Sequence, residues 1–189
     1  MGVLDSLPTT MIAESNNSQL IIRRIFADQT VLLRHSVLWP DHPVSHVLLP
    51  EDDSGNHYGA FLDGVVEAVA VISVFDQALP QPTLDGNMGF VPSLRFRKFA
   101  CDPAYQGQGI GTRLLQHVFD DALSNPKIPT RVVWCDARVT AAGWYERKEI
   151  GMTRFGETFS KSGVEYVRMK RVLTADPIPH STERGLTPQ

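Results

Sequence analysis

Three glycines, at positions 107, 109 and 111, lie between a segment with the pattern of a strand and one with the pattern of a helix. Before them, residues 94–100 alternate apolar and basic side chains, as a half-buried strand does. Glycine lets the backbone approach a ligand closely, and the first N–H groups of a helix favour negative charge. The segment therefore predicts a pyrophosphate cradle at the start of an amphipathic helix whose apolar stripe is Ile110, Leu114, Leu115, Val118, Phe119 and Ala122.

The spacing of these glycines argues against two common phosphate-binding motifs. A P-loop needs Lys and then Ser or Thr after its last glycine, whereas Thr112 and Arg113 follow Gly111. A dinucleotide-binding turn needs G-x-G-x-x-G among repeated β-α-β units, whereas this chain has G-x-G-x-G without such a repeat. Neither class of nucleotide-binding domain is expected.

The other patterns predict one mixed α+β domain and not a doubly wound sheet. A first helix is expected to be capped by Asp28, to carry Val31, Leu32, His35 and Leu38 on one side, and to end before Pro40. A tight Asp63-Gly64 turn is expected to join two strands of a hairpin. Further elements follow from apolar periodicity: strands at 19–26, 58–62, 65–75, 94–100, 131–135, 152–155 and 164–169, a long loop at 78–92, and a short helix at 140–147.

Length and charge limit the range of functions. The 189 residues suit one domain at 18–173, with an N-terminal extension at 1–17 and a proline-containing tail at 174–189. The net charge of -3 offers no basic surface for a nucleic acid. Two cysteines cannot form a disulfide framework, which favours a reducing, cytoplasmic location. Residues 1–6 fit an N-myristoylation pattern, but one such chain binds membranes only marginally, so no stable membrane association is expected.

Two motifs carry a resemblance to a known family. Gln106-x-x-Gly109-x-Gly111 resembles the acyl-CoA-binding motif of the GNAT superfamily of N-acetyltransferases, and residues 141–146 resemble that family's helix with a Tyr-Glu pair. The order of strands and helices fits the family across roughly residues 19–173. The resemblance implies a GNAT-like central sheet, mixed but mostly antiparallel, splayed at the cofactor strand and flanked by helices.

The resemblance also implies a set of site residues and acetyl-CoA as co-substrate. Tyr145 matches the tyrosine that protonates the departing CoA thiolate. The pantetheine arm would bind along the backbone of Phe99, Ala100 and Cys101. The phosphates would be held by residues of the glycine turn and by two arginines: Gln106, Gly107, Gln108, Gly109, Ile110, Gly111, Thr112, Arg113 and Arg138.

This chain departs from the family pattern in three places. The strand before the cradle carries no acid, so the general base must come from another element, with Asp136, Glu67, His35 and Glu157 as candidates. Arg138 stands where the family has an asparagine, and the spacing from Tyr145 to Gly151 is two residues longer than usual.

The resemblance also implies that the acceptor binds between the loop after the first helix and the last two strands. His35, Trp39, Glu157 and Tyr166 are the candidate substrate-binding residues. The spacing of His42 and His46 suits a metal, but Pro43 disfavours a helical presentation and no metal is expected. The sequence favours an N-acetyltransferase acting on a small primary amine. A protein lysine or N-terminal acetyltransferase and a non-catalytic acyl-CoA sensor stay open, as does a homodimer.

Overall fold

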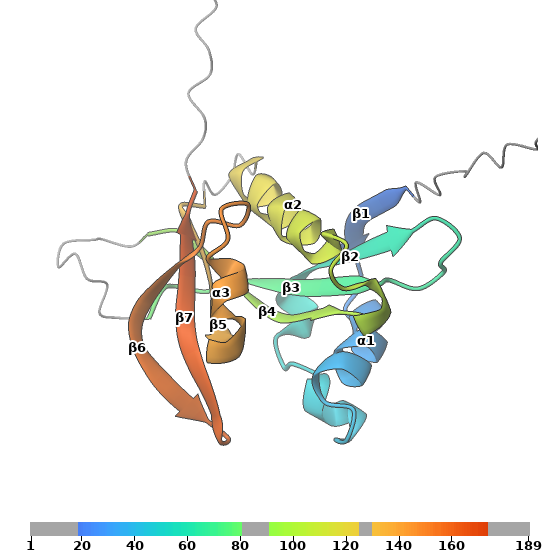
Figure 1. The fold of residues 1–189 in the computed structure, drawn as a ribbon, viewed down its shortest axis with the longest axis horizontal. Coiled ribbons are helices and arrows are strands. Elements are labelled where there is room, and N and C mark those ends of the chain that lie inside the picture. Colours follow the sequence, from blue (N-terminus) through green and yellow to red (C-terminus); the bar gives the residue numbers. More distant parts are fainter. Residues whose placement is uncertain (1–18, 81–90, 125–129, 174–189) are drawn as a thin grey trace, which may run out of the picture.

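One seven-stranded sheet organises the computed structural model, which describes residues 19–80, 91–124 and 130–173 (Figure 1). The strand order is β1-β2-β3-β4-β5-β7-β6, and every neighbouring pair is antiparallel except β4 and β5. The expected mixed, mostly antiparallel sheet is confirmed. Its strands are β1 Leu20–Ile25, β2 Asn56–Leu62, β3 Ala70–Asp76, β4 Ser93–Cys101, β5 Val132–Arg138, β6 Thr153–Lys161 and β7 Val164–Val172.

Several sequence predictions lie outside the described residues. These are the N-terminal extension at 1–17 with its myristoylation pattern, the tail at 174–189, and residues 81–90 of the expected loop. Among the described helices, none is long and apolar enough to cross a membrane.

The helix after the glycines, α2 (Ile110–Ser124), packs on strands β1 to β4 (Figure 1). The apolar stripe expected from the sequence is the buried face of this helix, without exception. It joins a core that includes Ile72 on β3, Val133 on β5 and Met169 on β7. Because the stripe fixes how α2 lies against the sheet, it also fixes where the glycine turn emerges.

The first helix, α1 (Asp28–Leu38), packs on β3 and β4 and differs from the prediction. Its buried residues are Thr30 and Arg34, whereas Leu32 of the predicted apolar face is 67% exposed. Asp28 does not cap the helix; it is the first helical residue, and its carboxylate accepts from the next backbone N–H. The predicted apolar face was wrong because the helix is held by polar contacts of Arg34.

Arg34 is fully buried and ties α1 to the sheet and to the loop that follows the helix. Its guanidinium donates two hydrogen bonds to the Asp52 carboxylate, at 2.8 and 2.9 Å, and one to the hydroxyl of Ser73. Ser73 lies between Ile72 and Val74, which both belong to the core beneath α2. Neighbouring strand residues point to opposite faces, so α1 covers the face of the sheet opposite α2.

The connection from β2 to β3 is longer than predicted. Gly64, with φ of +78°, does make a turn after Asp63, but residues 63–69 form a loop before β3 starts. Val66 is 90% exposed in this loop. Its β-branched side chain suggested a strand, but strand preference depends on a neighbouring strand or core that these residues do not reach.

The short second helix is also smaller than expected. Residues 139–141 form a 3-10 turn, and the α-helix α3 is confined to Ala142–Tyr145. The chain then returns to β6 through a turn in which the Met152 amide donates to the Tyr145 carbonyl at 3.1 Å.

Candidate active site

The two central strands, β4 and β5, separate along their length. They pair only from Ser93 to Arg95 on β4 with residues 132–134 on β5. From Phe96 to Cys101, β4 has no partner on this side among the described residues, while the rest of β5 pairs with β7. The backbone N–H and C=O groups along this edge of β4 therefore face the gap between the strands.

A β-bulge bends β4 where the two strands part. Arg97 pairs with Ser73 and Ala100 pairs with Val71, so two residues of β4 stand opposite one residue of β3. The first of these two residues, Lys98, has φ of +52°, which is uncommon for a residue other than glycine. A bulge increases the local twist and turns the strand away from its neighbour, which fits the splay expected at the cofactor strand.

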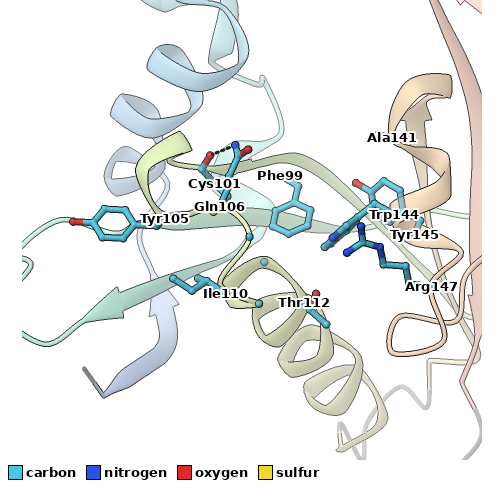
Figure 2. A pocket seen from close by; sticks show the side chains of 13 residues that line it. Phe99, Cys101, Tyr105, Gln106, Ile110, Thr112, Ala141, Trp144, Tyr145 and Arg147 are labelled. Carbon is cyan, nitrogen blue, oxygen red and sulfur yellow. Dashed lines mark hydrogen bonds between the residues drawn. The ribbon is translucent and has the colours of Figure 1, made fainter. Parts of the chain in front are cut away.

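A cavity of about 530 Å³ opens at this gap (Figure 2). Its walls come from the end of β4, the glycine turn with the first turn of α2, and α3. Figure 2 shows Phe99 between the glycine turn on one side and the Trp144 and Tyr145 rings on the other. The lining residues are Phe99, Cys101, Tyr105, Gln106, Gly107, Gly109, Ile110, Gly111, Thr112, Ala141, Trp144, Tyr145 and Arg147.

Four residues predicted to bind the cofactor do not line this cavity. Ala100 is buried and paired with Val71. Gln108 and Arg113 are exposed beside the turn and on α2. Arg138 ends β5 and pairs in register with Tyr166 on β7.

The sequence did not identify four residues that do line the cavity: Tyr105, Ala141, Trp144 and Arg147. The signal for Trp144 was its position directly before Tyr145 on α3, whereas Arg147 lies two residues after Tyr145, in the turn that follows this helix. Arg147 brings a cation to this wall, whereas Arg113, which was predicted to add positive charge for the phosphates, does not line the cavity.

The glycine turn has a conformation that requires glycine. Gly107 and Gly109 have φ of +77° and +75°, in the left-handed region. A Cβ atom at either position would meet nothing within 4 Å, so the space above the turn is open. The side-chain amide of Gln106 donates to the Cys101 carbonyl at 3.0 Å and braces the turn against the end of β4 (Figure 2).

The first three residues of α2, Ile110, Gly111 and Thr112, line the cavity. The Arg113 amide donates to the Gly109 carbonyl at 3.0 Å and begins the hydrogen-bond ladder of α2. The amides of Ile110, Gly111 and Thr112 precede that ladder and have no intrahelical acceptor. Together with the positive end of the helix dipole, they form a site suited to an anion such as a pyrophosphate.

Tyr145 forms the opposite wall and is 9% exposed. Its ring lies 4.9 Å from the Trp144 ring and 5.9 Å from the Phe96 ring, measured between centroids. Burial raises the pKa of its phenol well above 10, and the neighbouring Cys135 side chain acts in the same direction. The phenol therefore keeps its proton at any ordinary pH and can act as a proton donor.

The two cysteines are unsuited to carry an acyl group. Burial raises the pKa of the Cys135 thiol well above its ordinary value, and burial also raises the pKa of Cys101. The thiolate is the nucleophilic form of cysteine, and both sites disfavour it.

The four candidate acceptor residues come from two separate elements. Trp39 and His35 belong to the end of α1, where His35 Nε2 lies 2.6 Å from the His42 carbonyl oxygen. Tyr166 stacks on Phe159 across β6 and β7, with centroids 5.8 Å apart. Glu157 is exposed in the irregular stretch of β6 between Phe155 and Phe159. The structure thus groups these residues in pairs on two elements, α1 and the β6–β7 hairpin.

The predicted general-base candidates also lie apart. Asp136 follows the last β4–β5 pair, but its carboxylate makes an ion pair with Arg95 and lies 3.8 Å from Arg168. Glu67 is exposed in the loop between β2 and β3. Among the described residues, no group of three or more His, Cys, Asp or Glu side chains is arranged to hold a metal.

Comparison with known proteins identifies the family. The model of the "Acetyltransferase (GNAT) family" matches residues 22–152, which is more than half of the chain. The chain belongs to the GNAT acetyltransferase family. None of the curated proteins compared with it matches.

Solved structures share the GNAT fold at low sequence identity. An acyl-CoA N-acyltransferase from Pseudomonas aeruginosa matches with a TM-score of 0.57 and 17% identity, over 82% of this chain and 100% of that one. FeeM, an N-acyl amino acid synthase from uncultured soil microbes, matches with a TM-score of 0.60 and 14% identity, over 82% of this chain and 92% of that one. The ribosomal-protein-S18-alanine N-acetyltransferase from Escherichia coli matches with a TM-score of 0.57 and 14% identity, over 84% of this chain and 97% of that one.

The GNAT family uses acyl-CoA, and the residues of this site fit such a molecule. The open space over Gly107 and Gly109 and the free amides of α2 suit its pyrophosphate. The unpaired edge of β4 suits its extended amide-containing arm, which would hydrogen-bond as an added strand does.

Proposed function

We propose that this protein is an N-acetyltransferase that transfers the acetyl group of acetyl-CoA to a primary amine, most simply that of a small molecule. The observation that carries the proposal is the position of Tyr145. Its buried phenol lines the same cavity as the glycine turn and the unpaired edge of β4. An anion cradle, a groove for an extended chain and a proton donor therefore meet in one cavity.

In the proposed reaction, both substrates are bound together and the amine attacks the thioester directly. The amine nitrogen forms a bond to the acetyl carbon, the bond from that carbon to sulfur breaks, and the sulfur leaves as a thiolate. Tyr145 donates its proton to this thiolate, the proton lost by the amine passes to solvent, and Tyr145 then regains a proton from solvent. The thiol of Cys101 in the cavity wall and that of the buried Cys135 both have raised pKa values, which supports direct attack over an acyl-cysteine intermediate.

The chain's own residues would contribute mainly binding and orientation. The backbone from Phe99 to Cys101 would align the pantetheine arm, and the turn from Gln106 to Thr112 would hold the phosphates. Holding two reactants in a reactive geometry supplies a large part of enzymatic rate enhancement. A positioned acid adds a further factor of about 10² to 10⁴.

A protein amino group is the second candidate acceptor. Two structural neighbours are described as the S18-alanine N-acetyltransferase and as a NatC complex bound to Gag peptide and CoA, and both share this chain's fold. We favour the small molecule because the described residues carry no element beyond the GNAT core that would hold a peptide.

The decisive experiment measures release of the CoA thiol from acetyl-CoA with a panel of small amines and a panel of peptides. Turnover with at least one small amine, reduced in Tyr145→Phe, is the expected result. Turnover with peptides alone would instead show that the enzyme is a protein acetyltransferase. CoA binding without turnover on any amine, and without an effect of Tyr145→Phe, would make the chain a sensor. Failure to bind CoA would overturn the assignment altogether.

We also infer the setting in which the enzyme works. The domain is assigned to residues 18–173, and both cysteines are free thiols, which suits a reducing cytoplasm.

A further inference from the structure

Lys98 lies where β4 leaves β5, and its side chain is turned toward the α1 side of the sheet. Its ammonium lies 3.8 Å from the centroid of the Trp39 ring and 3.5 Å from the carbonyl oxygen of His46. The next residue, Phe99, lines the cavity assigned to acyl-CoA. Lys98 and Phe99 therefore lie on opposite sides of β4, Phe99 toward the cavity assigned to the cofactor and Lys98 toward Trp39 at the end of α1.

The backbone of Lys98 is held in an unfavourable conformation. Its φ of +52° is in the left-handed region, which residues with a Cβ adopt at a cost of about 1 kcal/mol or more. Such strain recurs at functional sites, where it directs a side chain that a regular strand would point elsewhere. The half-buried ammonium of Lys98 is the group that this bulge directs.

Among the described residues, no carboxylate forms an ion pair with the Lys98 ammonium. The nearby carboxylates are engaged by other cations, since Asp52 is paired with Arg34 and Glu51 with Arg97. Within residues 19–80, 91–124 and 130–173, Lys98 makes no ion pair. The titratable and charged groups around it are Arg34 on α1, His46 and Asp52 in the loop after α1, Arg97 on β4, and Lys161 on β6.

These surroundings lower the pKa of the Lys98 ammonium. Burial lowers the pKa of Lys98 to about 8, and the positive charges of Arg97, Arg34 and Lys161 add to the effect. Lys161 stands at the tip of the β6–β7 hairpin, so the hairpin also contributes positive charge near Lys98. An anion bound beside Lys98 would relieve this repulsion.

We propose that Lys98 binds an anionic group of the acceptor, so that the acceptor is a primary amine that also carries a carboxylate or a phosphate. The Trp39 ring beside the ammonium offers an apolar surface to the carbon chain next to that anionic group. This inference rests on the proposed function and narrows its substrate class. It makes Lys98 a specificity-determining residue rather than a proton-transfer residue.

Matched substrates separate this role from a general effect on catalysis. The kinetic panel pairs α-amino acids with the amines that lack their carboxylate, and phosphoethanolamine with ethanolamine. For the wild type, we expect kcat/KM to favour the anionic member of a productive pair by about tenfold or more, as for a charge-assisted contact. The carboxylate and phosphate arms identify which anion the site takes.

Three variants complete the kinetic test. Lys98→Met should lower kcat/KM for the anionic member by about tenfold, through KM, and leave its uncharged partner within about twofold. Lys98→Arg should retain the preference, because it keeps the cation. The matched control is Lys148→Met, an exposed lysine outside the acceptor region, which should behave as wild type. Equal losses of kcat for both members of a pair would overturn the proposal, as would a wild type that prefers the uncharged amine.

A binding experiment tests Lys98 even if no turnover is found. The probes are the N-acetylated forms of the same panel, added in the presence of CoA and measured by isothermal titration calorimetry. Acetylated amino acids or acetylated phosphoethanolamine should bind the wild type and bind Lys98→Met about tenfold more weakly. Absence of binding by every anionic probe, or equal binding by Lys98→Met, would overturn the inference. CoA affinity, measured separately, reports on the proposed function alone.

Discussion

Tyr145 on α3 packs on Phe96 of β4, with ring centroids 5.9 Å apart. This contact links the helix that carries the proposed acid to the strand that diverges from β5. Burial raises the pKa of the Tyr145 phenol well above its ordinary value. The phenol thus stays a proton donor in the cavity, and burial likewise keeps the Cys135 thiol neutral.

Replacing Tyr145 by Phe should lower kcat by about a hundredfold, because general acid catalysis contributes factors of this size. The ring and its packing on Phe96 and Trp144 are kept, so the affinity for CoA should stay within about twofold of wild type. Steady-state thiol release and CoA titration measure the two quantities. The control is Cys135→Ser, which keeps a small side chain with a polar atom at the strand and should retain most of the activity. An unchanged kcat in Tyr145→Phe would assign the proton transfer to another group.

Replacing Gly109 by Glu should abolish CoA binding without unfolding the domain. The new side chain would enter the open space above the turn and bring a negative charge to the helix N-terminus, where an anion is expected. The change also forces a residue with a Cβ into φ of +75°, so some stability is lost. CoA titration and thermal unfolding measure the two effects.

Gly64 provides a matched control for this prediction. It also has positive φ, of +78°, and open space where a Cβ would be added, but it lies in the loop between β2 and β3. Gly64→Glu should therefore show a similar loss of stability, of about 1 kcal/mol, with CoA affinity unchanged. If both variants lost CoA binding equally, backbone strain and not the cradle would be the cause.

The fold was largely predictable because its main elements have one apolar side. The buried residues of α2 recur at helical spacing. The alternation of apolar and basic residues along β4 indicates a strand with one face in the core. The glycine turn was predictable for a different reason, since only glycine adopts positive φ at two alternate positions without cost.

The errors fall where distant polar partners decide the structure. A charged residue on a helix normally indicates a solvent-exposed face. The partners of Arg34 are Asp52 and Ser73, which are distant in the sequence, and no pattern near Arg34 predicts these contacts. The bulge at Lys98 depends on how β4 pairs with β3, which a single strand's pattern does not encode. For the same reason the sequence did not single out Lys98 as a site residue.

Replacing Arg34 by Met should destabilise the domain by about 3–5 kcal/mol, because it leaves the Asp52 carboxylate without its partner in a mostly buried position. The matched control is Arg24→Met. Arg24 pairs with Asp121 at the same distance of 2.8 Å, but the two side chains are 58% and 38% exposed, so the loss should stay below about 1 kcal/mol. Urea denaturation measures the free energy of unfolding for both. Similar losses in the two variants would show that the Arg34 network does not anchor the loop after α1.

The charge state of Lys98 predicts how acceptor binding depends on pH. With a pKa of about 8, Lys98 is charged below pH 8 and becomes neutral above it. The KM of an anionic acceptor should therefore rise above pH 8, by up to about tenfold per pH unit while the ammonium is required. Dividing by the KM of the matched uncharged amine removes the titration that both amines share. Lys98→Arg should shift the rise to higher pH, because a guanidinium keeps its charge. A KM ratio that stays constant from pH 7 to pH 10 in the wild type would exclude Lys98 as the anion-binding residue.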